Sequence, residues 1–251
     1  MKHSTVIGII GAMDSEIEKL ASLMEGKKDE RSGGLLFLSG TLSGQNVTVV
    51  KCGVGKVNAA RCTQALADRF QPEFIINTGI AGALAPELSV GDVVIGTGLI
   101  QHDFDASAFG YAKGYLCTGK YPEKPTVFDS DKELVAAFEQ AAAKLVPTHR
   151  VHKGLIATGD LFVSDPLKKR ELRECFGAVA AEMEGAAIAQ TAYANGIPFV
   201  AVRAISDLAD GTTASSFDAF EREAADLSAT ILEELVSDIQ KAGGNIYGKV
   251  S

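Results

Sequence analysis

Two short acidic segments carry the clearest chemistry in this sequence. Glu182 and Glu184 follow the apolar run 178–181, and Asp207 follows the apolar run 199–204. Both runs are typical of buried strands, and ionisable side chains are rarely buried unless they are paired or functional. We therefore expect these carboxylates to lie at the ends of two neighbouring core strands and to form one site.

Carboxylates that share a partly apolar cleft shift each other's pKa values apart, so that one acts as a base and another as an acid near neutral pH. Such a pair suits hydrolysis of a glycosidic bond, in which one carboxyl group activates water and the other protonates the leaving group. Glu16, just inside a helix that follows the first predicted strand, is a further candidate.

Each acid also has a purely structural interpretation. Glu16 could belong to a solvated helix face, and Glu184 could favour the positive end of a helix. Ser206 and Asp207 could cap a helix. Arg203 is harder to explain in this way, because a guanidinium in an apolar strand requires a carboxylate partner. From the residues alone, a hydrolase with paired carboxylates and a set of structural acids both remain open.

Strand-like and helix-like segments alternate along the chain, which predicts a single-domain three-layer α/β/α fold with a central mixed, mostly parallel twisted sheet. We expect one domain over residues 1–242 and a flexible tail over 243–251. The expected strands are 6–10, 35–38, 47–50, 74–77, 93–100, 154–158, 178–181 and 199–204. The expected helices are 14–24, 56–70, 131–145, one that opens at Asp165-Pro166, 185–194 and 216–241.

Three segments between these elements bear on binding. Residues 102–128 have no clear periodicity, and irregular stretches of this length are usually functional. Gly53 and Gly55 follow a strand and open a helix, but the third glycine of a dinucleotide fingerprint is replaced by Asn58. We interpret them as a tight turn. The small residues of 77–82 end a strand and are plausible as the wall of a pocket.

The composition excludes several classes of partner. A net charge of −8 without a basic cluster argues against nucleic acid and anionic membranes. The four cysteines have no paired spacing, which favours reduced, buried thiols, and the four histidines lack the spacing of metal ligands. The first apolar run is short and broken by glycines, so we expect a core strand there rather than a signal peptide. We expect a cytoplasmic protein.

A set of motifs in this order resembles the bacterial 5′-methylthioadenosine/S-adenosylhomocysteine nucleosidases of the nucleoside phosphorylase superfamily. The resemblance extends from about Val6 to the last helix. The motifs are Gly11-Ala12-Met13-Asp14-Ser15-Glu16, Asn77-Thr78-Gly79-Ile80-Ala81-Gly82, His102-Asp103, Ala108-Phe109-Gly110-Tyr111, Thr158-Gly159-Asp160-Leu161-Phe162, Glu182-Met183-Glu184 and Arg203-Ala204-Ile205-Ser206-Asp207.

This resemblance implies hydrolysis of an N-glycosidic bond, without a cofactor or metal, that releases adenine and a 5-thioribose in methionine salvage. It implies that Glu16 deprotonates the attacking water, that Arg203 helps to hold this water and the carboxylate, and that Asp207, supported by Ser206, protonates the departing adenine. The implied substrate-binding residues are Ile80, Ala81, Gly82, Phe162, Val163, Glu182, Met183, Glu184, Phe109 and Tyr111.

Within this set Glu184 and the Met183 backbone would hold the ribose hydroxyls, whereas Phe162 and the Val163 backbone would contact adenine. Phe109 and Tyr111 would reach the site of a partner subunit, which implies a homodimer. The role of Glu182 is open beyond a supporting one.

The alternatives are a purine nucleoside phosphorylase, a futalosine-type nucleosidase and a non-catalytic nucleoside-binding protein. A phosphorylase needs cations for phosphate, and the sequence has Met13 to Glu16 and Asn77 at the corresponding places. Two departures from the family leave the preferred 5′ substituent open. Ile80 replaces a serine that helps to hold water in many relatives, and Cys117 lies where some relatives have proline.

Overall fold

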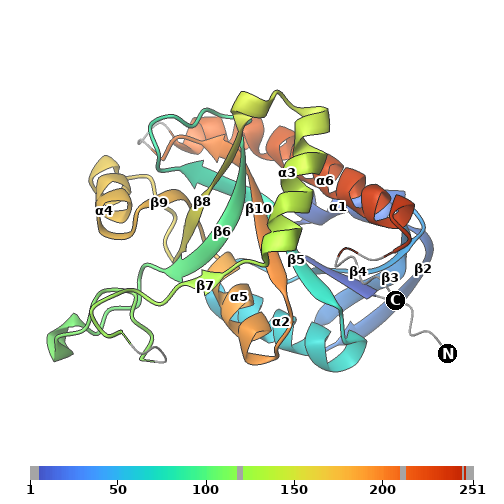
Figure 1. The fold of residues 1–251 in the computed structure, drawn as a ribbon, viewed down its shortest axis with the longest axis horizontal. Helices are drawn as coiled ribbons and strands as arrows, with labels where there is room; N and C mark the ends of the chain where they lie inside the picture. The colour runs from blue at the N-terminus through green and yellow to red at the C-terminus, as the bar shows by residue number, and fades with distance from the viewer. Residues whose placement is uncertain (1–5, 118–120, 210–212, 245, 247–251) are drawn as a thin grey trace.

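A mixed β-sheet runs through the chain, and helices cover both of its faces (Figure 1). The computed structural model describes residues 6–117, 121–209, 213–244 and 246. The strands are β1 (Val6–Gly11), β2 (Glu25–Ser32), β3 (Leu35–Leu42), β4 (Gln45–Lys51), β5 (Phe74–Ala83), β6 (Val93–Gln101), β7 (Phe128–Asp129), β8 (Val151–Thr158), β9 (Ala178–Glu182) and β10 (Phe199–Asp207). The helices are α1 (Asp14–Leu23), α2 (Lys56–Phe70), α3 (Lys132–Leu145), α4 (Pro166–Phe176), α5 (Gly185–Ala194) and α6 (Thr213–Lys241).

The sheet closes partly on itself. Its strand order is β10-β6-β8-β9-β5-β1-β4-β3-β2, and β10 also pairs with β5. The strands β5, β10, β6, β8 and β9 therefore form a ring of hydrogen-bonded neighbours. At one end of this ring Gly82 on β5 pairs with both Asp207 and Ala181, which brings the last residues of three strands together.

The helices cover the sheet because each has one apolar side. Leu20 of α1, Phe138 of α3 and Leu232 of α6 belong to one buried cluster, whereas Leu66 of α2 and Ile188 of α5 belong to a second one. These clusters form two apolar layers on opposite sides of the sheet. None of the helices within the described part of the chain is both long enough and apolar enough to cross a membrane.

The expected α/β fold with a mixed sheet flanked by helices is confirmed. Parallel and antiparallel pairs are equally represented among the described strands, rather than mostly parallel. The reason is that two parallel groups, β4-β1-β5-β10 and β6-β8-β9, meet through antiparallel pairs. The proposed tail 243–251 falls mostly on residues outside the described ones.

Two details of the fold differ from the expectations. The polar strand β2 pairs with β3 at the edge of the sheet, although its sequence shows no apolar alternation. Cys52 and Cys62 are buried free thiols as expected, whereas Cys117 and Cys175 are free but exposed.

Candidate active site

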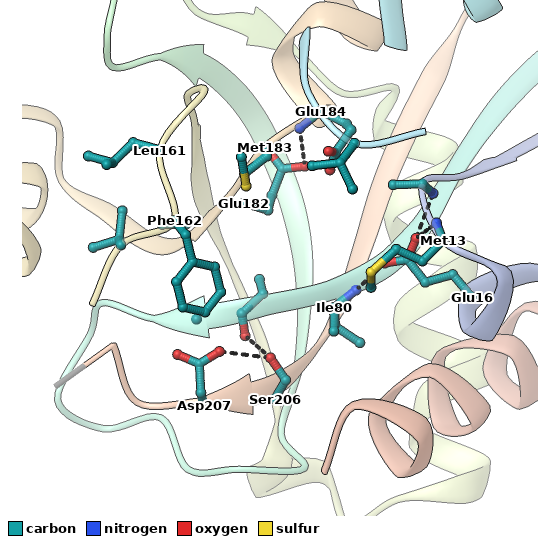
Figure 2. Close-up of a pocket in the computed structure, with 16 residues that line it drawn as sticks. Met13, Glu16, Ile80, Leu161, Phe162, Glu182, Met183, Glu184, Ser206 and Asp207 are labelled. Atoms are coloured by element: carbon teal, nitrogen blue, oxygen red, sulfur yellow. Dashed lines mark hydrogen bonds between the residues drawn. The ribbon is translucent and has the colours of Figure 1, made fainter. Parts of the chain in front are cut away.

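A cavity of about 400 Å³ opens where β1, β5, β9 and β10 end. This volume is in the range of small-molecule sites. Figure 2 shows Glu184 above the cavity, Phe162 and Asp207 on one side and Met13 and Glu16 on the other. The lining residues are Ala12, Met13, Glu16, Val54, Ile80, Ala81, Gly82, Leu161, Phe162, Val163, Ala181, Glu182, Met183, Glu184, Ser206 and Asp207.

Glu16 is held in place by backbone amides from two segments. Its Oε2 accepts hydrogen bonds from the amides of Ala12 at 2.6 Å and Met13 at 3.0 Å, and its Oε1 accepts one from the Ile80 amide at 3.1 Å. A Cβ on Gly79 would lie 2.5 Å from Oε1, so only glycine allows this close approach. Glu16 is therefore a fixed, buried carboxylate and not part of a solvated helix face.

The environment of Glu16 makes it a stronger base than an exposed glutamate. Burial raises the pKa of Glu16, although the charge of Arg203 and the hydrogen bonds from the backbone amides act in the opposite direction. A carboxylate with a raised pKa takes up a proton more readily. This is the property that activation of a water molecule requires.

Asp207 ends β10 on the other side of the cavity. Its Oδ2 accepts a hydrogen bond from the Ser206 hydroxyl at 2.9 Å, and its Oδ1 accepts one from the Ala209 amide at 2.9 Å. Ser206 and Asp207 thus stay within the strand rather than capping a helix. A Cβ on Gly82 would lie 2.9 Å from Oδ1, so this glycine gives the carboxyl group room at the cavity.

Glu184 lies between β9 and α5, where it is the capping residue of the helix. Its Oε1 accepts a hydrogen bond from the Gly55 amide at 2.7 Å. Burial, followed by the charge of the neighbouring Glu182, raises the pKa of Glu184 to about 8. The carboxyl group faces the cavity between Glu16 and Phe162 (Figure 2), where it can bind hydroxyl groups of a ligand.

Arg203 bonds a carboxylate other than that of Glu16. Its Nη2 donates to Oε2 of Glu182 at 2.6 Å and also to the side chain of Asn77, and no hydrogen bond joins it to Glu16 among the described residues. Glu182 also accepts hydrogen bonds from the Thr158 hydroxyl and, at 2.7 Å, from the Gly185 amide. Arg203 therefore pairs with Glu182, which lines the cavity, and acts on Glu16 only through its charge.

The remaining predicted residues divide into two groups. Ile80, Ala81, Gly82, Phe162, Val163 and Met183 all line the cavity, and Phe162 is 47% exposed there. Phe109 and Tyr111 are not among the described residues that line it. They lie on the irregular segment between β6 and β7, which projects from the body of the protein (Figure 1).

The sequence interpretation missed several contributors. The lining residues Val54 and Leu161 were not predicted, nor were the hydrogen-bonding roles of Asn77 and Thr158 beneath the cavity. Apolar and small polar side chains of this kind give no signal of their own, because any core contains them. Only the motifs around them could have drawn attention to these positions.

The lining also limits the chemistry. None of the described residues that line the cavity is a lysine, arginine or histidine. No cluster of three or more metal-ligating acids, histidines or cysteines occurs in the described ranges. The cavity offers the fixed carboxyl groups of Glu16 and Asp207 on opposite sides, Glu184 between them, Glu182 paired with Arg203, and an exposed aromatic ring. This arrangement suits acid–base cleavage of a ligand that carries a planar leaving group.

Comparison with known proteins identifies the family. The model of the phosphorylase superfamily matches residues 6–237. A 5′-methylthioadenosine/S-adenosylhomocysteine nucleosidase from Anoxybacillus flavithermus is 42% identical over 94% of this chain and 99% of its own.

Two solved structures are similar as well. The nucleosidase from Neisseria meningitidis in complex with methylthio-immucillin-A has a TM-score of 0.87 and 42% identity, covering 93% of this chain and 99% of its own. The native futalosine hydrolase of Helicobacter pylori has a TM-score of 0.87 and 32% identity, covering 95% of this chain and 100% of its own. On this evidence the chain belongs to the phosphorylase superfamily and, within it, to the family of the 5′-methylthioadenosine/S-adenosylhomocysteine nucleosidases.

Proposed function

We propose that this protein hydrolyses the N-glycosidic bond of 5′-methylthioadenosine and S-adenosylhomocysteine, releasing adenine and a 5-thioribose product. The observation that carries the proposal is the placement of Glu16 and Asp207 on opposite sides of one cavity, both buried and both fixed by hydrogen bonds. The names of the similar nucleosidases supply the substrate class.

Each carboxyl group has a role in this reaction. Adenine binds against Phe162, beside Asp207, which donates a proton to N7 of the base as the glycosidic bond breaks. The Ser206 hydroxyl orients this carboxyl group. Glu16 takes a proton from the water that attacks the ribose. Glu184, which lies between Glu16 and Asp207, holds the ribose hydroxyls. A nearby carboxylate stabilises the positive charge that develops on the sugar.

Water rather than phosphate is the expected nucleophile. A phosphorylase must hold a dianion next to the sugar, and for this it needs cationic side chains or free amides. At the corresponding side of the cavity, the amides of Ala12, Met13 and Ile80 already donate to Glu16. The carboxylate therefore occupies the donors that would otherwise attract an anion.

A second candidate is hydrolysis of futalosine, because the Helicobacter pylori futalosine hydrolase is also similar. Both activities cleave the N-glycosidic bond of a 5′-substituted nucleoside, and they differ in which nucleoside is accepted. A panel of adenosines with 5′-methylthio, 5′-homocysteinyl and 5′-deoxy groups, together with futalosine, separates them. Release of adenine from the thioadenosines at much higher kcat/KM supports the proposal, and preference for futalosine overturns it.

A homodimer is part of the proposal. Large apolar side chains are exposed on α2, on α5 and on the irregular segment: Val57 of α2 is 79% exposed, Tyr193 of α5 is 72% exposed and Phe109 is 81% exposed. The helices α2 and α5 pack against each other, and Tyr193 contacts Phe128 at the end of the irregular segment. We propose that two copies associate through α2, α5 and the irregular segment, so that Phe109 and Tyr111 of one copy cover the cavity of the other.

Mixing two inactive variants tests the shared site. Asp207→Asn removes the leaving-group acid, and Phe109→Ser removes the side chain that reaches across. If Phe109 serves the partner's site, a mixed dimer contains one complete site and regains activity. If Phe109 serves its own chain, the mixture stays inactive.

The proposed location is the cytoplasm. All four cysteines are free thiols, and two of them are buried, which fits a reducing compartment. The proposed partners are small nucleoside substrates and a second copy of the chain. The proposal includes neither nucleic acid nor a membrane.

A further inference from the structure

Three charged residues outside the cavity connect the segments that form its walls. Lys56 is the first residue of α2, and its Nζ lies 2.6 Å from Oδ1 of Asp103. The backbone amide of Lys56 donates to Oδ1 of Asp160 at 2.8 Å, and the amide of Asp160 donates to Oδ2 of Asp103 at 2.9 Å. These contacts form a closed cycle, which we name the Lys56–Asp103–Asp160 triangle.

Each corner of the triangle belongs to a segment with a place in the proposed site. The residue before Lys56 is Gly55, whose amide holds the carboxyl group of Glu184 at 2.7 Å. Asp160 lies two residues before Phe162, on the loop that follows β8. Asp103 is the second residue of the irregular segment that carries Phe109. The ribose-binding, adenine-binding and covering segments therefore meet at Gly55 and Lys56, through two backbone amides and the Lys56 side chain.

The turn before α2 is shaped for this connection. Gly55 has a φ of +96°, a conformation that disfavours any side chain, and a Cβ there would lie 3.1 Å from Oδ1 of Asp160. In this conformation the consecutive amides of Gly55 and Lys56 donate to Glu184 and to Asp160. Two neighbouring backbone groups thus fix the ribose side and the adenine side of the cavity relative to each other.

The side chain of Lys56 is well enclosed. It is 19% exposed and that of Asp103 is 28% exposed. Nζ also donates to the side chain of Gln101 at 3.1 Å, which in turn donates to Gln190 of α5 at 2.6 Å. Burial raises the pKa of Asp103, but the hydrogen bonds from Lys56 and from the Asp160 amide outweigh it and hold this pKa below its usual value.

We propose that Lys56 is a positioning residue. Its side chain holds Asp103, which accepts the Asp160 amide, and this fixes the adenine-binding loop of Phe162 relative to the ribose-binding Glu184. Lys56 does not line the cavity, so it acts through the residues that it orients. The inference rests on the proposed function. It makes one specific prediction. Loss of the triangle weakens binding of a ligand that spans the ribose and adenine sides of the cavity more than binding of a ligand that occupies the adenine side alone.

Adenine and 5′-methylthioadenosine are the two probes. For Lys56→Met we expect KM for 5′-methylthioadenosine to rise at least about tenfold, and the inhibition constant of adenine to change less than about threefold. Lys153→Met is the matched control. Lys153 lies near the start of β8 and forms an exposed ion pair with Glu139 of α3, so the change removes a lysine without altering the triangle. This control leaves both constants unchanged. Equal losses for both probes, or the same losses in the control, would overturn the proposal.

We expect the conservative change Asp103→Asn to have the same effects on KM for 5′-methylthioadenosine and on the inhibition constant of adenine. This variant tests the positioning role if Lys56→Met does not fold. In the double variant the losses in kcat/KM must not multiply, since either change already breaks the triangle. Multiplicative losses would show that the two residues act independently. If the unaltered protein releases no adenine from 5′-methylthioadenosine, the proposed function fails, whereas an active protein with unaffected variants refutes only the positioning role.

Discussion

The guanidinium of Arg203 is hydrogen-bonded to the carboxylate of Glu182, with 2.6 Å between Nη2 and Oε2, and both side chains are buried at the wall of the cavity. This pair accounts for the arginine in an apolar strand, which needed a carboxylate partner. It also gives Glu182 a role. The Glu182 carboxylate accepts hydrogen bonds from the backbone amides of Glu184 and Gly185. It thereby fixes the start of α5 and the position of Glu184.

Removal of one partner from this buried pair should destabilise the protein strongly. Glu182→Ala leaves the guanidinium without its countercharge, so we expect the free energy of unfolding to fall by about 3–5 kcal/mol. Urea denaturation measures the change. Glu139→Ala breaks only an exposed pair with Lys153 and should cost less than about 1 kcal/mol. Similar losses in the two variants would contradict the structural role of Glu182.

The pH dependence of activity should report on Glu16. This group must be ionised to accept a proton, and its pKa is raised by burial. We therefore expect kcat/KM to fall with decreasing pH through a midpoint above the ordinary glutamate value.

Ile80 contributes to this burial, because its side chain lines the cavity and its amide contacts the carboxylate. Ile80→Ser should move the acid limb of the kcat/KM profile to lower pH, and Ile80→Val should leave it in place. An unchanged limb in the serine variant would argue against Glu16 as the titrating base.

Glu184 should make stability depend on pH. Its pKa is raised to about 8 in the folded protein, so the folded state keeps a proton that the unfolded state loses near the ordinary value of 4.5. The contribution to stability is full below this ordinary value and is lost as the pH rises through about 8, by at most about 1.4 kcal/mol per pH unit.

The variant Glu184→Gln has no titrating group at this position, so the pH-dependent contribution of Glu184 to the unfolding free energy is absent. We expect its unfolding free energy to vary less between pH 5 and pH 8 than that of the unaltered protein. Denaturation curves across this range, with Glu139→Gln as an exposed control, measure the difference. Parallel pH dependences in all three proteins would show that Glu184 does not keep its proton.

Most of the fold could be predicted because the buried strands and the helices that pack on them show clear apolar periodicity in the sequence. The predicted ends of β5 and β10 were too early, at Asn77 and Ala204, because small and polar residues follow there. The ladder continues through them, since Asp207 still pairs with Gly82. Strand β2 was missed because an exposed edge strand needs no apolar face.

The site could be predicted only in part from the residues alone. The acids after β9 and β10 were visible because charges rarely follow apolar runs without a reason. Glu16 has the local sequence of a surface helix, and its burial depends on the Ile80 amide from a strand 64 residues away. The pairing of Arg203 with Glu182 is equally non-local, so the residues alone could show that the arginine needs a carboxylate partner but not which one.

The nucleophile tests the central claim most directly. Purified protein is incubated with 5′-methylthioadenosine, with and without saturating inorganic phosphate, and the sugar product is followed by phosphorus NMR alongside adenine release. We predict the same rate of adenine release under both conditions and no phosphorylated sugar, since the carboxylate of Glu16 occupies the amides near the attacking group. Adenine release that requires phosphate and yields a ribose 1-phosphate would contradict the account.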